Sequence, residues 1–258
     1  MPRIALLACL ATFLHLAAAH AAAESGFELW RAGKYEDAIA SGLGDKTPAG
    51  ATLAARAALS LLMLRIPPCL ACVTRAEQLA RAAIKADPKS PAAHIYLAVA
   101  LGYEARIVGA LAAARDGLAR QSRLELDTAL GAEPQNALAL ATLGGWHIDT
   151  VRIAGGFLAS LTFGATREEG MKQFAAALAL APDDPVIAYQ YALELASYDA
   201  SRYRALITTT LARAAADAPR SAFEQQSCQR AATLLNVLKT QDAATFARQV
   251  RQFMGIAE

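Results

Sequence analysis

Four similar stretches of this chain end in proline, and each carries an alanine five residues before that proline. The prolines are Pro88, Pro134, Pro182 and Pro219, which lie 46, 48 and 37 residues apart. A helix does not continue through proline, because the ring removes a backbone N–H and clashes with the preceding turn. Self-similarity at such a period is typical of repeat proteins. The sequence therefore predicts an all-α chain of stacked helix pairs.

Six helix beginnings are predicted from local signals. A capping side chain stands just before a proline suited to the first helical position at Thr47-Pro48, Ser90-Pro91 and Asp184-Pro185. The spacing of a capping box occurs at Thr74-x-x-Glu77, Thr166-x-x-Glu169 and Ser221-x-x-Glu224.

A large residue followed by a small one recurs nine and ten residues after the repeat prolines. The pairs are Leu97-Ala98, Leu143-Gly144 and Tyr191-Ala192, and the last unit departs from the pattern with Cys228-Gln229. A small residue lets a partner helix approach closely. We expect these positions to meet the alanine that lies five residues before the next proline. The exception suits a terminal repeat, which has only one neighbour.

The first unit carries a helix-turn-helix elbow, Leu29-Trp30-Arg31-Ala32-Gly33-Lys34-Tyr35-Glu36-Asp37-Ala38-Ile39. With Gly33 at the turn, Tyr35 packing into it and Ala38 at a close contact, this segment resembles the tetratricopeptide-repeat (TPR) family. The resemblance implies a superhelical solenoid of about five divergent helix pairs over residues 24–258. The units ending at Pro134 and Pro182 exceed the usual repeat length, so we expect extra helical turns in their linkers.

The unit from Leu143 to Pro182 is more distinctive. Its Leu143-Gly144-Gly145-Trp146-His147, Phe163-Gly164-Ala165 and Glu169-Gly170-x-x-x-Phe174-Ala175 segments are similar to repeats in the regulators of microtubule dynamics and in the T component of TRAP-type transporters. The second resemblance implies an accessory subunit that carries a small apolar ligand.

The N-terminus has the composition of an export signal. Met1-Pro2-Arg3 is basic, Ile4 to Ala19 is apolar, and Ala21-Ala22-Ala23 offers a cleavage pattern. We expect residues 1–23 to be a signal peptide and Glu24 to begin the mature chain. A retained anchor is the alternative, but about 16 apolar residues fall short of the roughly 20 that a bilayer requires. No later segment has the length and apolar character of a span, so a periplasmic location is predicted.

Charge composition argues against a nucleic-acid partner. The chain has 25 Lys and Arg residues against 23 Asp and Glu residues, a formal charge of +2, without a block of like charges. Its 55% hydrophobic content is ample for a continuous core. A partner protein, a peptide or an apolar small molecule is more consistent with this balance.

Cys69-Leu70-Ala71-Cys72 is the one chemically reactive motif. It follows Pro67-Pro68 and precedes Thr74, which predicts a loop just ahead of a helix. In an exported protein we favour a small structural disulfide or a plain loop pair. A redox pair normally follows a strand in a βαβ unit, and zinc needs two further ligands at workable spacing. If the pair is oxidised, Cys228 is left as a buried free thiol.

Catalytic signatures are absent from the sequence. After signal removal only His94 and His147 remain, each within a helix, and Asp149 lies two residues after His147 on a different helix face. Serine nucleophile motifs, phosphate-binding glycine loops and HExxH pairs do not occur. We therefore predict a binding protein rather than an enzyme, with no catalytic residues, no metal and no cofactor.

The concave surface of a solenoid is its usual binding site and is lined by the first helix of each pair. Residues seven, eleven and fifteen positions after each repeat proline share one helix face. They are Ile95, Val99 and Tyr103, then Ala141, Gly145 and Asp149, then Tyr189, Leu193 and Ser197, then Gln226 and Arg230. We expect Tyr103, Asp149 and Tyr189 to contact the ligand, with Trp146 and His147 in the same groove, although ordinary packing between repeats also accounts for them.

The apolar segment 155–164 has two interpretations. It is a short extra helix packed under the repeat, or it is the lid or wall of a channel for an apolar ligand. The favoured function is an exported TPR-type scaffold that holds a peptide or partner protein of the cell envelope in its groove. The alternative is a carrier or accessory subunit for a small apolar ligand, and a redox helper using Cys69 and Cys72 is the third hypothesis.

Overall fold

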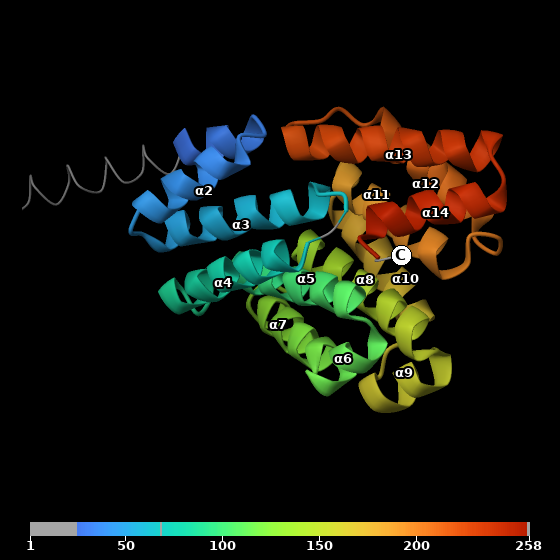
Figure 1. Cartoon of the computed structure of the whole chain (residues 1–258), viewed down its shortest axis with the longest axis horizontal. Coiled ribbons are helices and arrows are strands. Elements are labelled where there is room, and N and C mark those ends of the chain that lie inside the picture. The colour runs from blue at the N-terminus through green and yellow to red at the C-terminus, as the bar shows by residue number, and fades with distance from the viewer. Residues whose placement is uncertain (1–24, 68, 257–258) are drawn as a thin grey trace, which may run out of the picture.

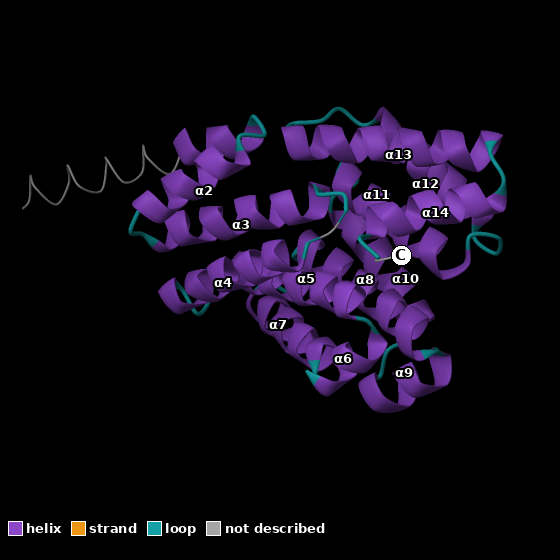
Figure 2. Cartoon of the chain, in the orientation of Figure 1, coloured by secondary structure: helices purple, strands orange, loops and turns teal. Residues whose placement is uncertain are grey.

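The computed structural model of the protein describes residues 25–67 and 69–256, and in these ranges it consists of helices and turns without a strand (Figure 2). The predicted signal peptide, residues 1–23, lies outside the described residues. Residues 25–31 are helical. The later helices are α2 (Tyr35–Gly44), α3 (Pro48–Leu64), α4 (Leu70–Ala86), α5 (Pro91–Val108), α6 (Ala110–Arg115), α7 (Leu118–Ala132), α8 (Ala137–Ala154), α9 (Gly156–Phe163), α10 (Arg167–Leu180), α11 (Pro185–Asp199), α12 (Arg204–Ala216), α13 (Ala222–Thr240) and α14 (Ala243–Met254).

Helices that follow one another along the chain pack against each other, as the prediction of an all-α solenoid requires. Helix α3 contacts both α2 and α4, α5 contacts α7, α8 contacts α10, and α12 contacts both α11 and α13 (Figure 1). The short helices α6 and α9 are inserted between the two members of a pair, which accounts for the long third and fourth units. Within the described ranges, no helix combines the length and the apolar character that crossing a bilayer demands.

Five of the six predicted helix beginnings are confirmed. Thr47, Ser90, Asp184, Thr166 and Ser221 each cap a helix, with the side-chain oxygen accepting a backbone N–H of the first turn. The prediction at Thr74 is wrong, because Thr74 lies inside α4 and its hydroxyl donates to Leu70 O. Helix α4 instead begins at Leu70, with Cys69 as its capping residue.

Small residues mark the close contacts between helices. The alanines five residues before the repeat prolines, Ala83, Ala129, Ala177 and Ala214, are all fully buried. Gly144 of α8 meets α10 so closely that an added Cβ would lie 2.6 Å from Phe174 Cδ2 and 2.9 Å from Gly170 O. Gly170 is constrained in the same way from the other side, since its Cβ would lie 2.8 Å from Ile148 Cγ1. The glycine pair thus sets the α8–α10 distance.

The two ends of the solenoid meet. Arg230 of α13 donates from Nη1 to Met63 O at 2.9 Å and from Nη2 to Leu64 O at 2.7 Å, at the C-terminal end of α3. A cation at that position also interacts favourably with the helix dipole. Arg31 Nε donates to Arg220 O at 3.2 Å, in the segment just before α13. Figure 1 shows α13 passing along the same upper edge as α2, so the superhelix closes on itself.

Candidate functional site: a central cavity

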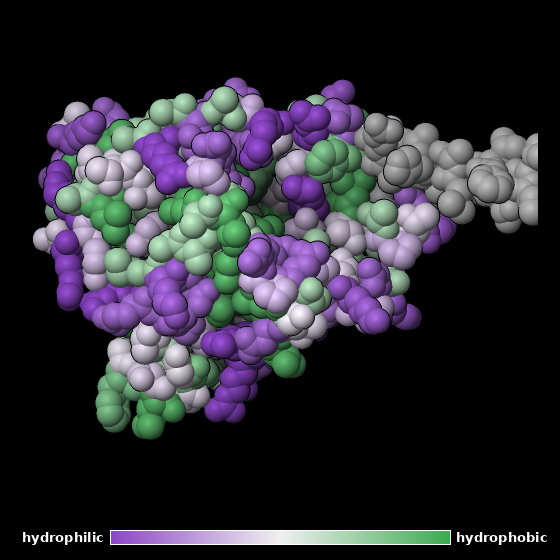
Figure 3. Space-filling view, turned by 180° about the vertical axis from the view of Figure 1, so that it is seen from behind, coloured by the Kyte–Doolittle hydropathy of each residue, from purple (hydrophilic) through white to green (hydrophobic). Residues whose placement is uncertain are grey.

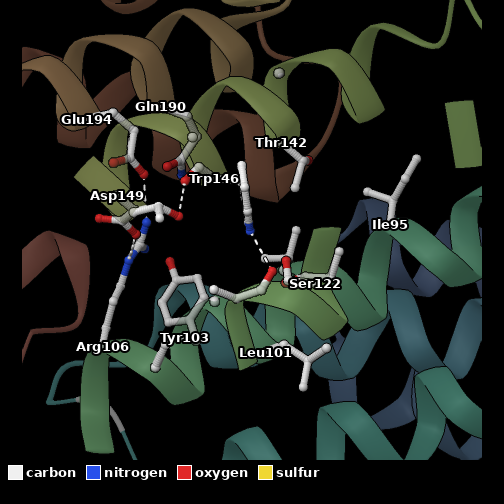
Figure 4. A pocket seen from close by; sticks show the side chains of 18 of the residues that line it. Ile95, Leu101, Tyr103, Arg106, Ser122, Thr142, Trp146, Asp149, Gln190 and Glu194 are labelled. Carbon is white, nitrogen blue, oxygen red and sulfur yellow. Dashed lines mark hydrogen bonds and ion pairs between the residues drawn. The ribbon is translucent and has the colours of Figure 1, made fainter. Parts of the chain in front are cut away.

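A cavity of about 1280 Å³ lies inside the closed superhelix. Its wall is built mainly from the first helices of successive pairs, α3, α5, α8 and α11, to which α6, α7, α9 and the first turn of α13 add side chains. Figure 4 shows lining residues that come from helices far apart in the chain. The cavity is somewhat larger than the roughly 300–1,000 Å³ typical of small-molecule pockets.

Four of the hydroxyl groups in the wall already have hydrogen-bond partners inside the protein. Ser60 accepts from Trp30 Nε1 at 2.9 Å and donates to Arg56 O at the same distance. Ser122 donates to Ala98 O at 3.0 Å. Thr142 and Thr150 donate to carbonyls one turn earlier in their own helix, at 2.7 and 2.6 Å. These four hydroxyls therefore present little free donor capacity to a ligand.

A cluster of ion-paired groups lies at one end of the cavity, apart from the other charged lining residues, which are Arg56, Arg120, Glu133, Asp184 and Glu224. Arg106 of α5 donates from Nε to Asp149 Oδ2 of α8 and from Nη2 to Glu194 Oε1 of α11, both at 2.6 Å (Figure 4). Its Nη1 also donates to Met254 O at 3.3 Å. Arg152 completes the cluster through two bonds to Asp149 Oδ1, at 2.9 and 2.7 Å. The Arg106 guanidinium thus connects α5, α8, α11 and the end of α14.

The three central groups titrate differently because burial and charge compete. Burial by itself raises the pKa of Asp149, but Arg106 and Arg152 outweigh it and bring that pKa below its usual value. Burial and the nearby Asp149 charge together raise the pKa of Glu194 to about 8, despite Arg106. Burial disfavours the charged form of Arg106, yet Asp149 and Glu194 raise its pKa overall. Near neutral pH the cluster thus holds an ionised Arg106–Asp149 pair beside a protonated Glu194.

Two predicted groove residues pack around this cluster and the apolar wall. The Arg106 guanidinium carbon lies 5.0 Å from the centre of the Tyr103 ring, and Tyr103 is 5% exposed. Trp146 lines the cavity further along and donates from Nε1 to Ala119 O at 2.8 Å. Both aromatic rings therefore border the cavity, and internal contacts fix their orientation.

The structure divides the predicted groove residues into two groups. Tyr103, Trp146 and Asp149 line the cavity, whereas Tyr189 and His147 are not among its lining residues. Tyr189 is 1% exposed and belongs to the hydrophobic core around α11. His147 faces α10, where its Nδ1 accepts the backbone N–H of Thr166 at 3.2 Å.

The residues predicted to line the concave surface do line the cavity on two helices, but on a third helix a different face lines it. Every residue predicted from α5 and α8 lines the cavity, but α11 contributes Ile187, Gln190 and Glu194 in place of Tyr189, Leu193 and Ser197. Helix α11 packs against α12, α13 and α14 as well as α8, and these neighbours bury the face that carries Tyr189 and Leu193. None of the residues predicted from α13 lines the cavity; Phe223 and Glu224 do.

Arg106 and Glu194 were not predicted as site residues. Glu194 is the only charged residue between Pro185 and Ala196 in a helix that is otherwise largely apolar, which was a usable signal. Arg106-Ile107-Val108-Gly109 also recurs 46 residues later as Arg152-Ile153-Ala154-Gly155. The two arginines of this repeated motif bind the same carboxylate, that of Asp149. Sequence spacing alone does not show which carboxylates the arginines meet.

Segment 155–164 forms a short helix that also borders the cavity. Helix α9 spans Gly156–Phe163, and its Leu158, Thr162 and Phe163 line the wall. The prediction of a short extra helix is confirmed, and the role of this segment in binding an apolar ligand stays a prediction. Its other face carries Phe157 and Leu161, which are 84% and 73% exposed.

The cysteine pair lies apart from the cavity. Cys69 and Cys72 are joined in a disulfide with a Cα–Cα distance of 5.2 Å, and neither lines the cavity. The expected loop position is wrong, since Cys69 caps α4 and Cys72 lies in its first turn. Cys228 is a free, buried thiol.

Neither a metal site nor a similarity to known proteins indicates a function for this chain. Among the described residues, no group of three or more His, Cys, Asp and Glu side chains is arranged to hold a metal ion. No model of a known protein family matches the chain, and no curated protein matches it either. Membership of the TPR family and the likeness to transporter T components therefore stay predictions.

Proposed function

We propose that this protein is a carrier in the cell envelope for an elongated amphiphilic small molecule. The apolar body of the ligand lies along α5 and α8, and its polar head meets the Arg106 cluster. The observation that supports this most directly is a cavity whose wall is mainly apolar and which holds the buried Arg106, Asp149 and Glu194 cluster at one end. Sites for apolar ligands typically combine such a wall with a few polar groups that fix orientation.

Hydrogen bonding favours this ligand over an extended peptide. A peptide brings one N–H and one C=O per residue, and each needs a partner when buried. The wall hydroxyls described above are occupied, and Asn136 uses its side chain to cap α8 and to bind Glu133. The peptide-binding scaffold remains the competing hypothesis, with the apolar side chains of a partner as its anchors.

The charge of the cluster selects the head group. Arg106 and Arg152 are cationic, Asp149 is anionic, and Glu194 is neutral below its raised pKa of about 8, which leaves one net positive charge. Arg106 has five N–H donors, of which three make the bonds described. A carboxylate or another acceptor-only head group complements this arrangement.

Gly102 provides a direct test of cavity binding. This glycine lines the cavity within α5, and an added Cβ there would meet no atom within 4 Å. Gly102→Leu should place an apolar side chain inside the cavity without disturbing the fold. Gly131→Leu is the matched control, because Gly131 is equally unobstructed but does not line the cavity. Binding of the probe 1-N-phenylnaphthylamine, followed by its fluorescence, should weaken at least about tenfold in Gly102→Leu and stay unchanged in the control.

Native mass spectrometry of the gently purified protein identifies the natural ligand class. A discrete extra mass that disappears in Gly102→Leu supports the carrier. Equal probe affinity in the wild type and Gly102→Leu would refute it. Retention of a protein partner by an otherwise empty cavity would support the scaffold instead.

A further inference from the structure

Arg56 of α3 lines the cavity without a carboxylate partner. Its side chain is partly buried, yet its guanidinium makes neither an ion pair nor a hydrogen bond with any residue that the structure describes. The two other lining arginines differ from it, because Arg106 binds two carboxylates and Arg120 is exposed. Buried charges in proteins are normally paired. Arg56 therefore favours an anionic group on a molecule that enters the cavity.

Aromatic rings hold the Arg56 guanidinium in position. Its central carbon lies 3.8 Å from the centre of the Trp30 ring and 5.2 Å from the centre of the Phe27 ring. These two rings stack on each other with their centres 5.4 Å apart, and Trp30 Nε1 donates to Ser60 Oγ at 2.9 Å. Stacking uses the face of a guanidinium and leaves the N–H groups in its plane for a ligand.

Tyr96 of α5 brings a second donor to the same part of the cavity. It is 7% exposed and lines the cavity, and its hydroxyl has no hydrogen-bond partner within the described part of the chain. Burial raises the pKa of Tyr96, and the charge of Arg56 acts in the opposite direction, which places the guanidinium near the phenol. A cation and a neutral hydroxyl that border one cavity complement an oxyanion.

The acidic residues of the cavity wall are bonded to groups other than Arg56. They are Glu133, Asp149, Asp184, Glu194 and Glu224. None of the five forms an ion pair with Arg56, so the charge of this guanidinium stays available to a bound molecule.

Arg56 and the Arg106 cluster are separate positions along the cavity. Tyr96, beside Arg56, and Arg106 are ten residues apart in α5, which is about 15 Å along the helix axis. The α5 residues that line the cavity between them are apolar except for the Tyr103 hydroxyl. Figure 3 shows that the molecule is hollowed on the face seen from behind, with apolar side chains beside the recess. A ligand that meets both positions is elongated, polar at two points and apolar between them.

We propose that Arg56, together with Tyr96, binds a second oxyanion group of the ligand, so that the natural ligand carries an acidic group toward each of its two ends. This inference rests on the proposed carrier function, because it concerns the same cavity. One acidic group meets the Arg106 cluster, the apolar body lies along α5, and the other group accepts charge-assisted hydrogen bonds from Arg56. A carboxylate and a phosphate share the chemistry that this position recognises.

Competition with bound 1-N-phenylnaphthylamine tests the second position. Hexadecanoic acid and hexadecanedioic acid share an apolar chain, so the ratio of their inhibition constants reports on the second carboxylate. Arg56→Gln should change this ratio at least about tenfold against the diacid. The matched control is Arg65→Gln, which should keep the wild-type ratio, because Arg65 follows the last residue of α3, is exposed and does not line the cavity.

Two further competitions sharpen the test. Tyr96→Phe removes only the hydroxyl and should change the ratio in the same direction, which keeps the site testable if Arg56→Gln does not fold. The compound 16-phosphonohexadecanoic acid, used in place of the diacid, distinguishes a phosphate-like group from a carboxylate, since the tighter competitor identifies the oxyanion.

The outcomes separate this site from the carrier function. An unchanged ratio in Arg56→Gln, or in Tyr96→Phe if the first variant does not fold, would overturn the proposal. So would an equal change in Arg65→Gln. Because Gly102→Leu tests binding in the cavity by itself, probe binding that depends on Gly102 with a ratio that ignores Arg56 would refute the second position and leave the carrier function standing.

Discussion

Glu194 should make the protein less stable as pH rises through neutrality. Its carboxyl is 3% exposed, and burial together with Asp149 raises its pKa from 4.5 to about 8. Between these two values the folded protein binds a proton that the unfolded chain releases. Since stability falls with pH wherever the folded state binds more protons, the contribution of Glu194 is fully present below about pH 4.5 and is lost as pH approaches 8.

The size of the effect follows from the same two pKa values. Where the folded state binds one proton more than the unfolded state, each pH unit changes the free energy of unfolding by about 1.4 kcal/mol. From pH 5 to pH 8 the loss attributable to Glu194 is therefore about 3 kcal/mol, from its pKa of about 8. That is a large part of the roughly 5–15 kcal/mol that stabilises a typical domain.

Glu194→Gln isolates the contribution of the Glu194 carboxyl to the pH dependence of stability. The amide keeps an acceptor oxygen for Arg106 Nη2, which donates to Glu194 Oε1 at 2.6 Å, but it does not titrate. Urea unfolding followed by circular dichroism at pH 5, 6, 7 and 8 should show the variant gaining about 3 kcal/mol on the wild type over that range. Glu77, whose pKa burial and Glu104 raise to about 7, contributes equally to both proteins and cancels. Parallel profiles would show that Glu194 is ionised at pH 7 and that the account of the cluster is wrong.

Three further substitutions test the close contact of α8 with α10, the titration of His147 and the closure of the superhelix. Gly144→Ala should destabilise the protein by about 1–3 kcal/mol, because its Cβ would lie 2.6 Å from Phe174, whereas unobstructed Gly131→Ala should stabilise it by up to about 1 kcal/mol in the same urea titration. Burial and Arg123 lower the pKa of His147 to about 4, so the wild type should lose stability as pH falls from 6.5 toward 4. His147→Gln should remove this loss. A proton NMR titration giving His147 a pKa near 6.5 would contradict the prediction. Arg230→Ala removes the bonds to Met63 O and Leu64 O that close the superhelix, so the bound probe should dissociate faster in stopped-flow measurements, and an unchanged rate would exclude this contact as a gate.

The helix ends are the part of the fold most accessible from sequence. Proline and the capping side chains act within a few residues, so Thr47, Ser90, Asp184, Thr166 and Ser221 could be identified without the rest of the molecule. Thr74 shows the limit of that reasoning. Cys69 supplies an alternative cap five residues earlier, and the helix extends to the earlier signal. Local sequence patterns indicate possible helix beginnings, but where two of them lie close together, only the folded structure shows which one starts the helix.

The cavity face was only partly predictable, for a geometric reason. Spacing of three and four residues identifies which side chains share a helix face, as it did for Tyr103 and Asp149, but it does not fix how far the helix is rotated toward its neighbours. Helix α11 is covered by α12, α13 and α14, which turns Tyr189 into the core and Glu194 toward Arg106. That rotation depends on packing with helices up to the C-terminal end of the described chain.

The sequence by itself determined that this protein is a chain of paired helices, because alanine, glycine, proline and capping residues act on their immediate neighbours. Only the tertiary structure decided that the superhelix closes and encloses a cavity. Arg230 meets the end of α3 across more than 160 residues, and Arg106 meets Glu194 across 88. Contacts over such separations depend on the rotation between every two successive helix pairs, added along the solenoid, and a local sequence pattern does not determine this total.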